Sequence, residues 1–182
     1  MKDRLKTIID LENYPIYDLN SKKIKKLVKK CKRDLDQFSC AKIPKFILPK
    51  SLEVMNMELE KKIQDVYMSK KKINAYLNSK DDPTLSKNHP KRIFMDRDNG
   101  YLNSDIFPKN SEMKFLYEQD ELLNFISSCL GVSPIYRWAD PLACHAYNVM
   151  KPGGVLPWHF DSCEFTLSFM IQKSEKGGIF EY

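Results

Sequence analysis

The residues of this sequence best suited to chemistry are His159 and Asp161, which are separated only by Phe160. If the segment is a strand, side chains two residues apart share a face, so the imidazole and the carboxylate lie side by side. Trp158 and Phe160 would then point to the opposite face and pack in the core. An imidazole beside a carboxylate is the beginning of the two-histidine, one-carboxylate set that binds non-haem Fe(II). Such a short pattern also arises by chance in many proteins, so alone it predicts only a candidate ligand pair.

The sequence around the pair carries more information than the pair itself. The surrounding features, in chain order, are Asn148, the Gly153-Gly154 turn, Glu164-Phe165, the positions Leu167, Met170 and Gln172, and Gly177-Gly178 before Phe180-Glu181-Tyr182. Together, residues 145–182 resemble the Fe(II)/2-oxoglutarate-dependent oxygenases, and they look closest to the branch of amino-acid hydroxylases and halogenases. The rest of the chain, including residues 139–142, resembles that superfamily only loosely.

The resemblance implies a site and a reaction. His159 and Asp161 would bind Fe(II) with a second histidine, and 2-oxoglutarate and O2 would take the other positions on the metal. The implied reaction hydroxylates a small-molecule substrate, such as a free amino acid, while 2-oxoglutarate is oxidised to succinate and CO2. Halogenating relatives have Gly or Ala in place of the carboxylate, so Asp161 predicts a hydroxylase rather than a halogenase.

Asn148, eleven residues before His159, is the candidate cosubstrate-binding residue. In several families of the superfamily, an asparagine at that position hydrogen-bonds 2-oxoglutarate. A tyrosine two residues later often assists it, but this chain has Met150 there. An asparagine satisfied by nearby backbone groups is an equal alternative.

Two groups that the resemblance requires have no equivalent after Asp161. The superfamily places its second histidine, and then an arginine or lysine for the far carboxylate of 2-oxoglutarate, several strands later. No histidine or arginine follows Asp161, and the only lysines after it, Lys173 and Lys176, are predicted at a turn; His89 and His145 precede it. We predict that neither is the third ligand, because His145 lies an odd number of residues from Asn148 on one strand and His89 lies in a loop. The site is therefore expected to be incomplete in this chain, which ends at Tyr182.

Three functions follow from these observations. The chain is the first part of an oxygenase, or an inactive or partner-dependent fragment of one, or a basic protein that binds nucleic acid or another acidic surface through residues 21–33. That segment has eight basic residues in thirteen, and the spacing of its apolar residues predicts an amphipathic helix. It lacks the interleaved aromatic residues of a base-stacking surface, so nucleic acid is not the expected partner. We favour the oxygenase.

Length and composition agree with a single domain. The chain has 182 residues, of which 42% are hydrophobic, and a net charge of +6. No apolar run approaches the roughly 18 to 20 residues of a membrane helix, and the first residues do not predict a secretory signal. The five cysteines include no CxxC pair, which predicts reduced thiols and a cytoplasmic location. The oligomeric state is left open.

The elements that must position the ligand pair divide into two portions. Residues 1–133 are predicted to be a helical and loop portion, with helices over 21–33, about 52–77 and 111–130, the last capped by Gly131, and a long loop over 79–110. Residues 134–182 are predicted to contain strands at 135–139, 145–150, 155–161 and 165–173. The expected fold class is α+β with a sandwich or barrel core. The resemblance narrows this to a helical part packed on a double-stranded β-helix (jelly roll), of which only the first half is present.

Overall fold

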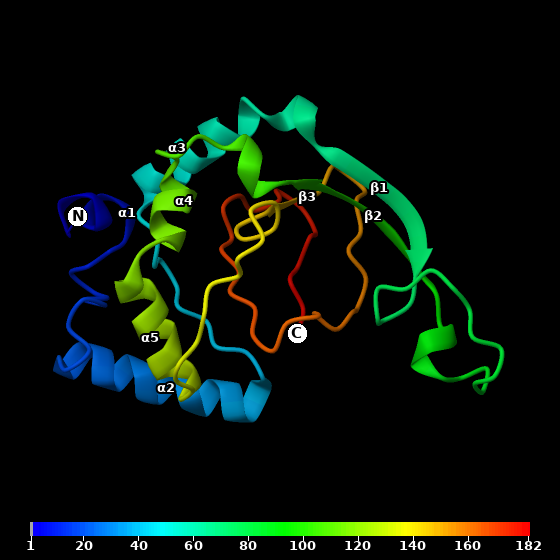
Figure 1. The fold of residues 1–182 in the computed structure, drawn as a ribbon, viewed down its shortest axis with the longest axis horizontal. Helices are drawn as coiled ribbons and strands as arrows, with labels where there is room; N and C mark the ends of the chain where they lie inside the picture. Colours follow the sequence, from blue (N-terminus) through cyan, green and yellow to red (C-terminus); the bar gives the residue numbers. More distant parts are fainter. Residues whose placement is uncertain (1) are drawn as a thin grey trace.

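The computed structural model describes residues 2–182 and has the predicted α+β fold class. The helices lie on one side of the molecule, the long β1–β2 ribbon arches over the other, and the C-terminal segment runs between them (Figure 1). None of the helices in these residues is long and apolar enough to cross a lipid bilayer. The elements are the helices α1 (Lys2–Ile8), α2 (Lys22–Phe38), α3 (Pro49–Glu60), α4 (Glu112–Tyr117) and α5 (Asp120–Leu130), the strands β1 (Tyr67–Ile73), β2 (Met95–Leu102) and β3 (Tyr147–Val149), and short 3-10 helices at Ile63–Asp65, Pro90–Arg92 and Ser104–Ile106.

The sheet has the order β1-β2-β3, and both pairings are antiparallel. β1 and β2 pair along the whole of β1, from Tyr67 opposite Tyr101 to Ile73 opposite Met95. β3 covers only the last three residues of β2 on its other edge. β2 is therefore the central strand, and its backbone is hydrogen-bonded on both sides at that end.

The segments on either side of β3 differ from the expected jelly roll. Residues 135–139 and 165–173 form no strand, and 155–161 contributes a single bridge to β2. A strand is stable only where a neighbour satisfies its backbone groups. The three residues of β3 are too short an edge to continue the sheet, so the described residues contain a three-stranded sheet and not half a barrel.

α2 confirms the helix predicted for residues 21–33 and extends it to Phe38. The Ser21 side chain caps its start by accepting a hydrogen bond of 3.3 Å from the Ile24 N–H. Ser39 ends the helix in the left-handed conformation, with its N–H 2.8 Å from the Leu35 carbonyl oxygen. Ile24 and Cys31 are buried, and the lysines occupy the outer face, as the amphipathic pattern predicts.

The helix predicted for residues 52–77 is wrong in its second half. α3 ends at Glu60, and the chain becomes β1 at Tyr67. The apolar spacing that predicted a helix continues by coincidence through Val66 and Ile73. Pairing with β2 overrides it, because β1 exchanges its backbone hydrogen bonds with that strand along its full length.

The loop predicted for residues 79–110 is also wrong, because it contains β2. Asp, Asn and Gly are typical of turns, and β2 is rich in all three. The single helix predicted for 111–130 is two helices, α4 and α5, separated by Glu118 and Gln119. The Gly131 cap is confirmed: its φ is +72°, and its N–H lies 2.9 Å from the Ser127 carbonyl oxygen.

One hydrophobic core joins the helices, the sheet and the C-terminal segment. Phe46 is central to it, since its ring stacks on Phe125 of α5 at 6.1 Å and on Phe169 at 6.4 Å between centroids. Tyr147 of β3 packs on Phe107 at 4.9 Å. Residues from both predicted portions thus share this core, while the boundary at residue 133 stays a prediction.

The stacked phenylalanines give a direct test of this core. Phe125 is 2% exposed, so Phe125→Ala removes a buried ring and leaves a cavity. We expect it to lower the free energy of unfolding by about 3 to 5 kcal/mol, as measured by urea denaturation. Phe38→Ala is the matched control, because Phe38 is 61% exposed, and it should change stability by less than about 0.5 kcal/mol. Equal effects of the two substitutions would contradict this core.

Candidate functional site

The segment that carries the predicted ligand pair is fixed to the sheet at two points. At Val155, two backbone hydrogen bonds of 2.8 Å join it to Asp98 of β2, on the side of β2 where β3 pairs. At Phe160, the N–H donates to the carbonyl oxygen of Ala75, just beyond the end of β1, at 2.8 Å. Residues 156–159 therefore cross from the β3 side of β2 to its β1 side. The ligand pair lies at the end of the sheet where β1 ends and β2 begins.

The structure brings His159 and Asp161 together, although the segment is not a strand. The His159 Nε2 atom lies 3.4 Å from the Asp161 Oδ1 atom. His159 Nδ1 is 2.7 Å from the Pro157 carbonyl oxygen. When Nδ1 carries the proton for that hydrogen bond, the lone pair is on Nε2, the atom that faces the carboxylate. The side chains are 23% and 50% exposed, so a metal ion can reach both.

A third ligand does not join this pair. No group of three His, Cys, Asp or Glu side chains suited to a metal ion exists within residues 2–182. His145 precedes β3, where its Nδ1 atom contacts the Cys144 Sγ atom at 3.1 Å and its ring packs on Tyr117 at 5.7 Å. His89 caps the 3-10 helix at Pro90–Arg92 by accepting a hydrogen bond from the Lys91 N–H.

Asn148 points toward β2. It lies opposite Tyr101 in the β2–β3 register, and its side-chain oxygen accepts a hydrogen bond of 3.3 Å from the Asn99 amide. The side chain of Asn99 therefore binds Asn148, whereas the alternative drawn from the sequence expected nearby backbone groups to do so. It remains exposed, so it can also bind a ligand.

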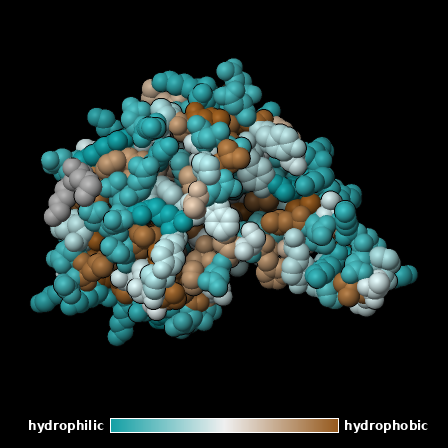
Figure 2. All heavy atoms as spheres, viewed as in Figure 1, coloured by the Kyte–Doolittle hydropathy of each residue, from teal (hydrophilic) through white to brown (hydrophobic). Residues whose placement is uncertain are grey.

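The aromatic residues beside the pair are not in the core. Trp158 is 59% exposed and Phe160 is 62% exposed. Because the segment bends at Trp158 and forms no strand, the alternation that placed them on a buried face does not apply. Phe160 instead packs against Tyr76 at the surface, with 5.3 Å between ring centroids. Figure 2 shows a largely hydrophilic face, with hydrophobic residues exposed in several places, among them the lower left and the middle of the view.

A polar row runs along one face of β2 and was not predicted; it extends from Arg97, near the end of the sheet that holds the ligand pair, to Tyr101 at the other end. Arg97, Asn99 and Tyr101 alternate along the strand, so their side chains share one face. Arg97 Nε donates to the Asn99 side-chain oxygen at 2.6 Å, and Arg97 Nη2 donates to the Tyr101 hydroxyl. Asn148 is opposite Tyr101 and completes the row. No alternation of polar and apolar residues could have revealed this row in the sequence, because residues 96–99 of β2 are all polar.

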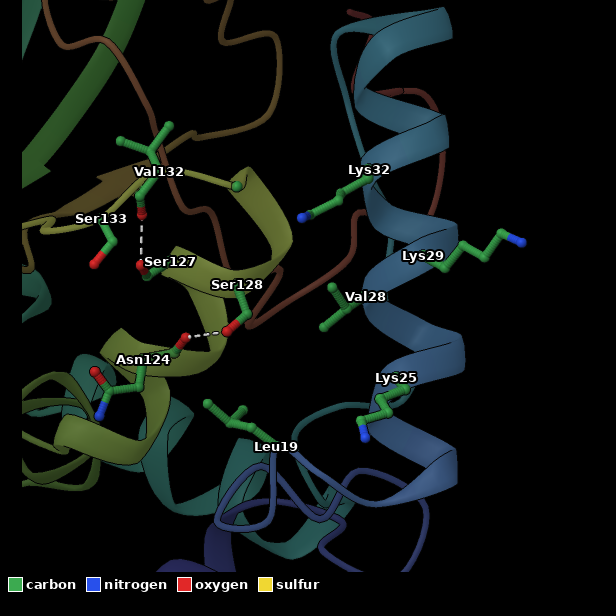
Figure 3. A pocket seen from close by; sticks show the side chains of 11 residues that line it. Leu19, Lys25, Val28, Lys29, Lys32, Asn124, Ser127, Ser128, Val132 and Ser133 are labelled. Atoms are coloured by element: carbon green, nitrogen blue, oxygen red, sulfur yellow. Dashed lines mark hydrogen bonds between the residues drawn. The ribbon is translucent and has the colours of Figure 1, made fainter.

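The basic face of α2 borders an open cavity of about 670 Å³ between α2 and α5 (Figure 3). Lys32 lies over the C-terminal cap of α5, since its Nζ atom would be 3.4 Å from a Cβ atom placed on Gly131. Unpaired carbonyl groups make the C-terminal end of a helix electronegative, so the lysine has a structural role there. Lys30 is paired with Asp34 at 2.5 Å. Lys30 and Lys32 thus have partners within the protein, so no nucleic acid is needed to explain these two basic residues.

The chain was compared with protein-family models, with curated proteins and with solved structures, and none of the three comparisons gave a match.

The half-buried His145 gives a pH prediction. Burial, reinforced by the charge of Lys114, lowers the pKa of His145 below its usual value near 6.5. As the pH falls through that value, the unfolded chain takes up a proton that folded His145 resists, so the folded state loses stability. We expect His145→Gln to reduce the loss of unfolding free energy between about pH 7.5 and about pH 5.5, measured by urea denaturation. The same loss in both proteins would contradict this role of His145.

Proposed function

We propose that this chain belongs to a non-haem Fe(II)- and 2-oxoglutarate-dependent dioxygenase that acts in the cytoplasm. The reaction is the hydroxylation of a small molecule, such as an amino acid, coupled to the oxidation of 2-oxoglutarate to succinate and CO2. The catalytic core proposed for such an enzyme is a jelly roll, of which the β2–β3 region and the ligand segment would be part.

The observation that carries this proposal is the convergence of His159 Nε2 and Asp161 Oδ1 at 3.4 Å. A hydrogen bond to the Pro157 carbonyl oxygen orients the imidazole, as is usual for metal-binding histidines. A neutral imidazole and a carboxylate are donors that Fe(II) accepts, and both are accessible to solvent. The pair therefore fits two of the three protein ligands of an Fe(II) centre, and the third is not supplied by residues 2–182 as they are arranged here.

The proposed roles follow from the chemistry of each side chain. His159 and Asp161 would hold the iron, which supplies the activation of O2 and of 2-oxoglutarate in such enzymes. Asp161 also occupies the position that a halide would need, which favours hydroxylation. Asn148 would donate from its amide group to 2-oxoglutarate, since its oxygen already accepts a hydrogen bond from Asn99.

Removal of either ligand tests the pair. We expect His159→Ala and Asp161→Ala each to weaken Fe(II) binding by at least about tenfold, because each removes one of only two protein donors. Anaerobic calorimetric titration with Fe(II) measures this, and affinity is the readout because it does not require a complete active site.

His89→Ala and Asp96→Ala are the matched controls, because they remove the same two functional groups elsewhere. His89 caps a 3-10 helix, and Asp96 pairs with Lys72 at the surface. Both variants should bind Fe(II) as the unaltered chain does. If Asp161→Ala binds Fe(II) with undiminished affinity, Asp161 is not a ligand and the proposed function loses its main support.

A further inference from the structure

The strongest unexplained feature of the molecule is the guanidinium of Arg97. The residue is only 8% exposed, yet it forms no ion pair within residues 2–182. Its hydrogen-bond partners, the Asn99 amide oxygen and the Tyr101 hydroxyl, are both neutral. A buried charge without a countercharge is costly, and buried arginines are normally paired.

The carboxylates nearest in sequence do not neutralise Arg97. Asp96 and Asp98 flank it on β2, so strand alternation places their side chains on the opposite face. There each is paired with a lysine of β1, Asp96 with Lys72 at 3.6 Å and Asp98 with Lys70 at 3.2 Å. The face of β2 that carries Arg97 thus keeps an uncompensated positive charge.

The other members of the row are suited to a bound anion. The Tyr101 ring lies 4.9 Å from the guanidinium carbon, and it holds the fork in a fixed orientation. Two of the five N–H donors of Arg97 are used, at Nε and Nη2, and the other three have no hydrogen-bond partner within residues 2–182. The side-chain amide of Asn148 lies on the same face and adds further donors. No carboxylate belongs to this row.

We infer that Arg97, with Tyr101 and Asn148, binds the carboxylate group of a small-molecule ligand. A planar guanidinium matches a carboxylate with two parallel hydrogen bonds, and the bound charge would neutralise Arg97. Arg97 is next to Asp98, to which the ligand segment is bonded at Val155, and its guanidinium reaches along the strand to Tyr101, so the carboxylate would lie over the middle of β2. The site itself requires no metal. Its failure is therefore distinguishable from failure of the proposed function.

The carboxylate has two chemical sources that the test separates. The full chain, free of metal, is titrated with 2-oxoglutarate, with each of the free amino acids and with inorganic phosphate, and the Nε–H signal of Arg97 is followed by NMR. Binding of 2-oxoglutarate identifies the cosubstrate as the ligand, and binding of an amino acid identifies the substrate. No movement of the Arg97 signal with any carboxylate, or equal movement with phosphate, overturns the inference.

Two variants separate a binding role from a structural one. Arg97→Gln should weaken the carboxylate's affinity by at least about tenfold, and Arg97→Lys should restore only part of it, because lysine keeps the charge but not the fork. Arg92→Gln is the matched control, since Arg92 is already paired with Asp81, and it should bind normally. If Arg97→Gln does not fold, Tyr101→Phe decides: it keeps the ring, removes the hydroxyl and should weaken binding, whereas unchanged affinity contradicts the site.

Discussion

The pairing of β2 on both of its edges is the constraint on which the rest of the structure depends. β1 covers one edge of β2 along its length, while β3 and Val155 cover parts of the other. Because β2 is fixed in this way, its two faces are fixed as well. Leu102 is directed into the hydrophobic core, and Arg97 and Asn99 are held on the opposite face. The bridge at Val155 then determines where the segment carrying His159 and Asp161 lies.

The helices and their ends could be predicted from local sequence, because capping and apolar spacing act over a few residues. The lysine-rich sequence of α2 and the glycine cap of α5 are examples. β1 and β2 could not, because their stability comes from pairing with each other and not from their own composition. β2 resembles a loop because polar and turn-forming residues occupy both of its faces, Arg97 and Asn99 on one and Asp96, Asp98 and Gly100 on the other.

Only the part of the candidate site that is local in sequence could be predicted. His159 and Asp161 are close in sequence, so their proximity needed no knowledge of the fold, and it survives although the expected strand does not form. Arg97 is distant in sequence, and only the bridge between Asp98 and Val155 connects its strand to the segment of the ligand pair. A cationic group and a pair of metal-binding donors held by one sheet are suited to binding an anionic ligand and a metal ion.

The central claim is that one end of this sheet, where β1 ends, binds a metal ion at His159 and Asp161. Paramagnetic broadening by Mn²⁺, used as a stand-in for Fe(II), tests it most directly in the ¹⁵N-labelled chain. The account predicts that the signals of residues 158–161 disappear first, followed by those of Ala75 and Tyr76, which contact Phe160. Broadening centred elsewhere, for example around Cys144 and His145, with residues 158–161 unaffected, would contradict it.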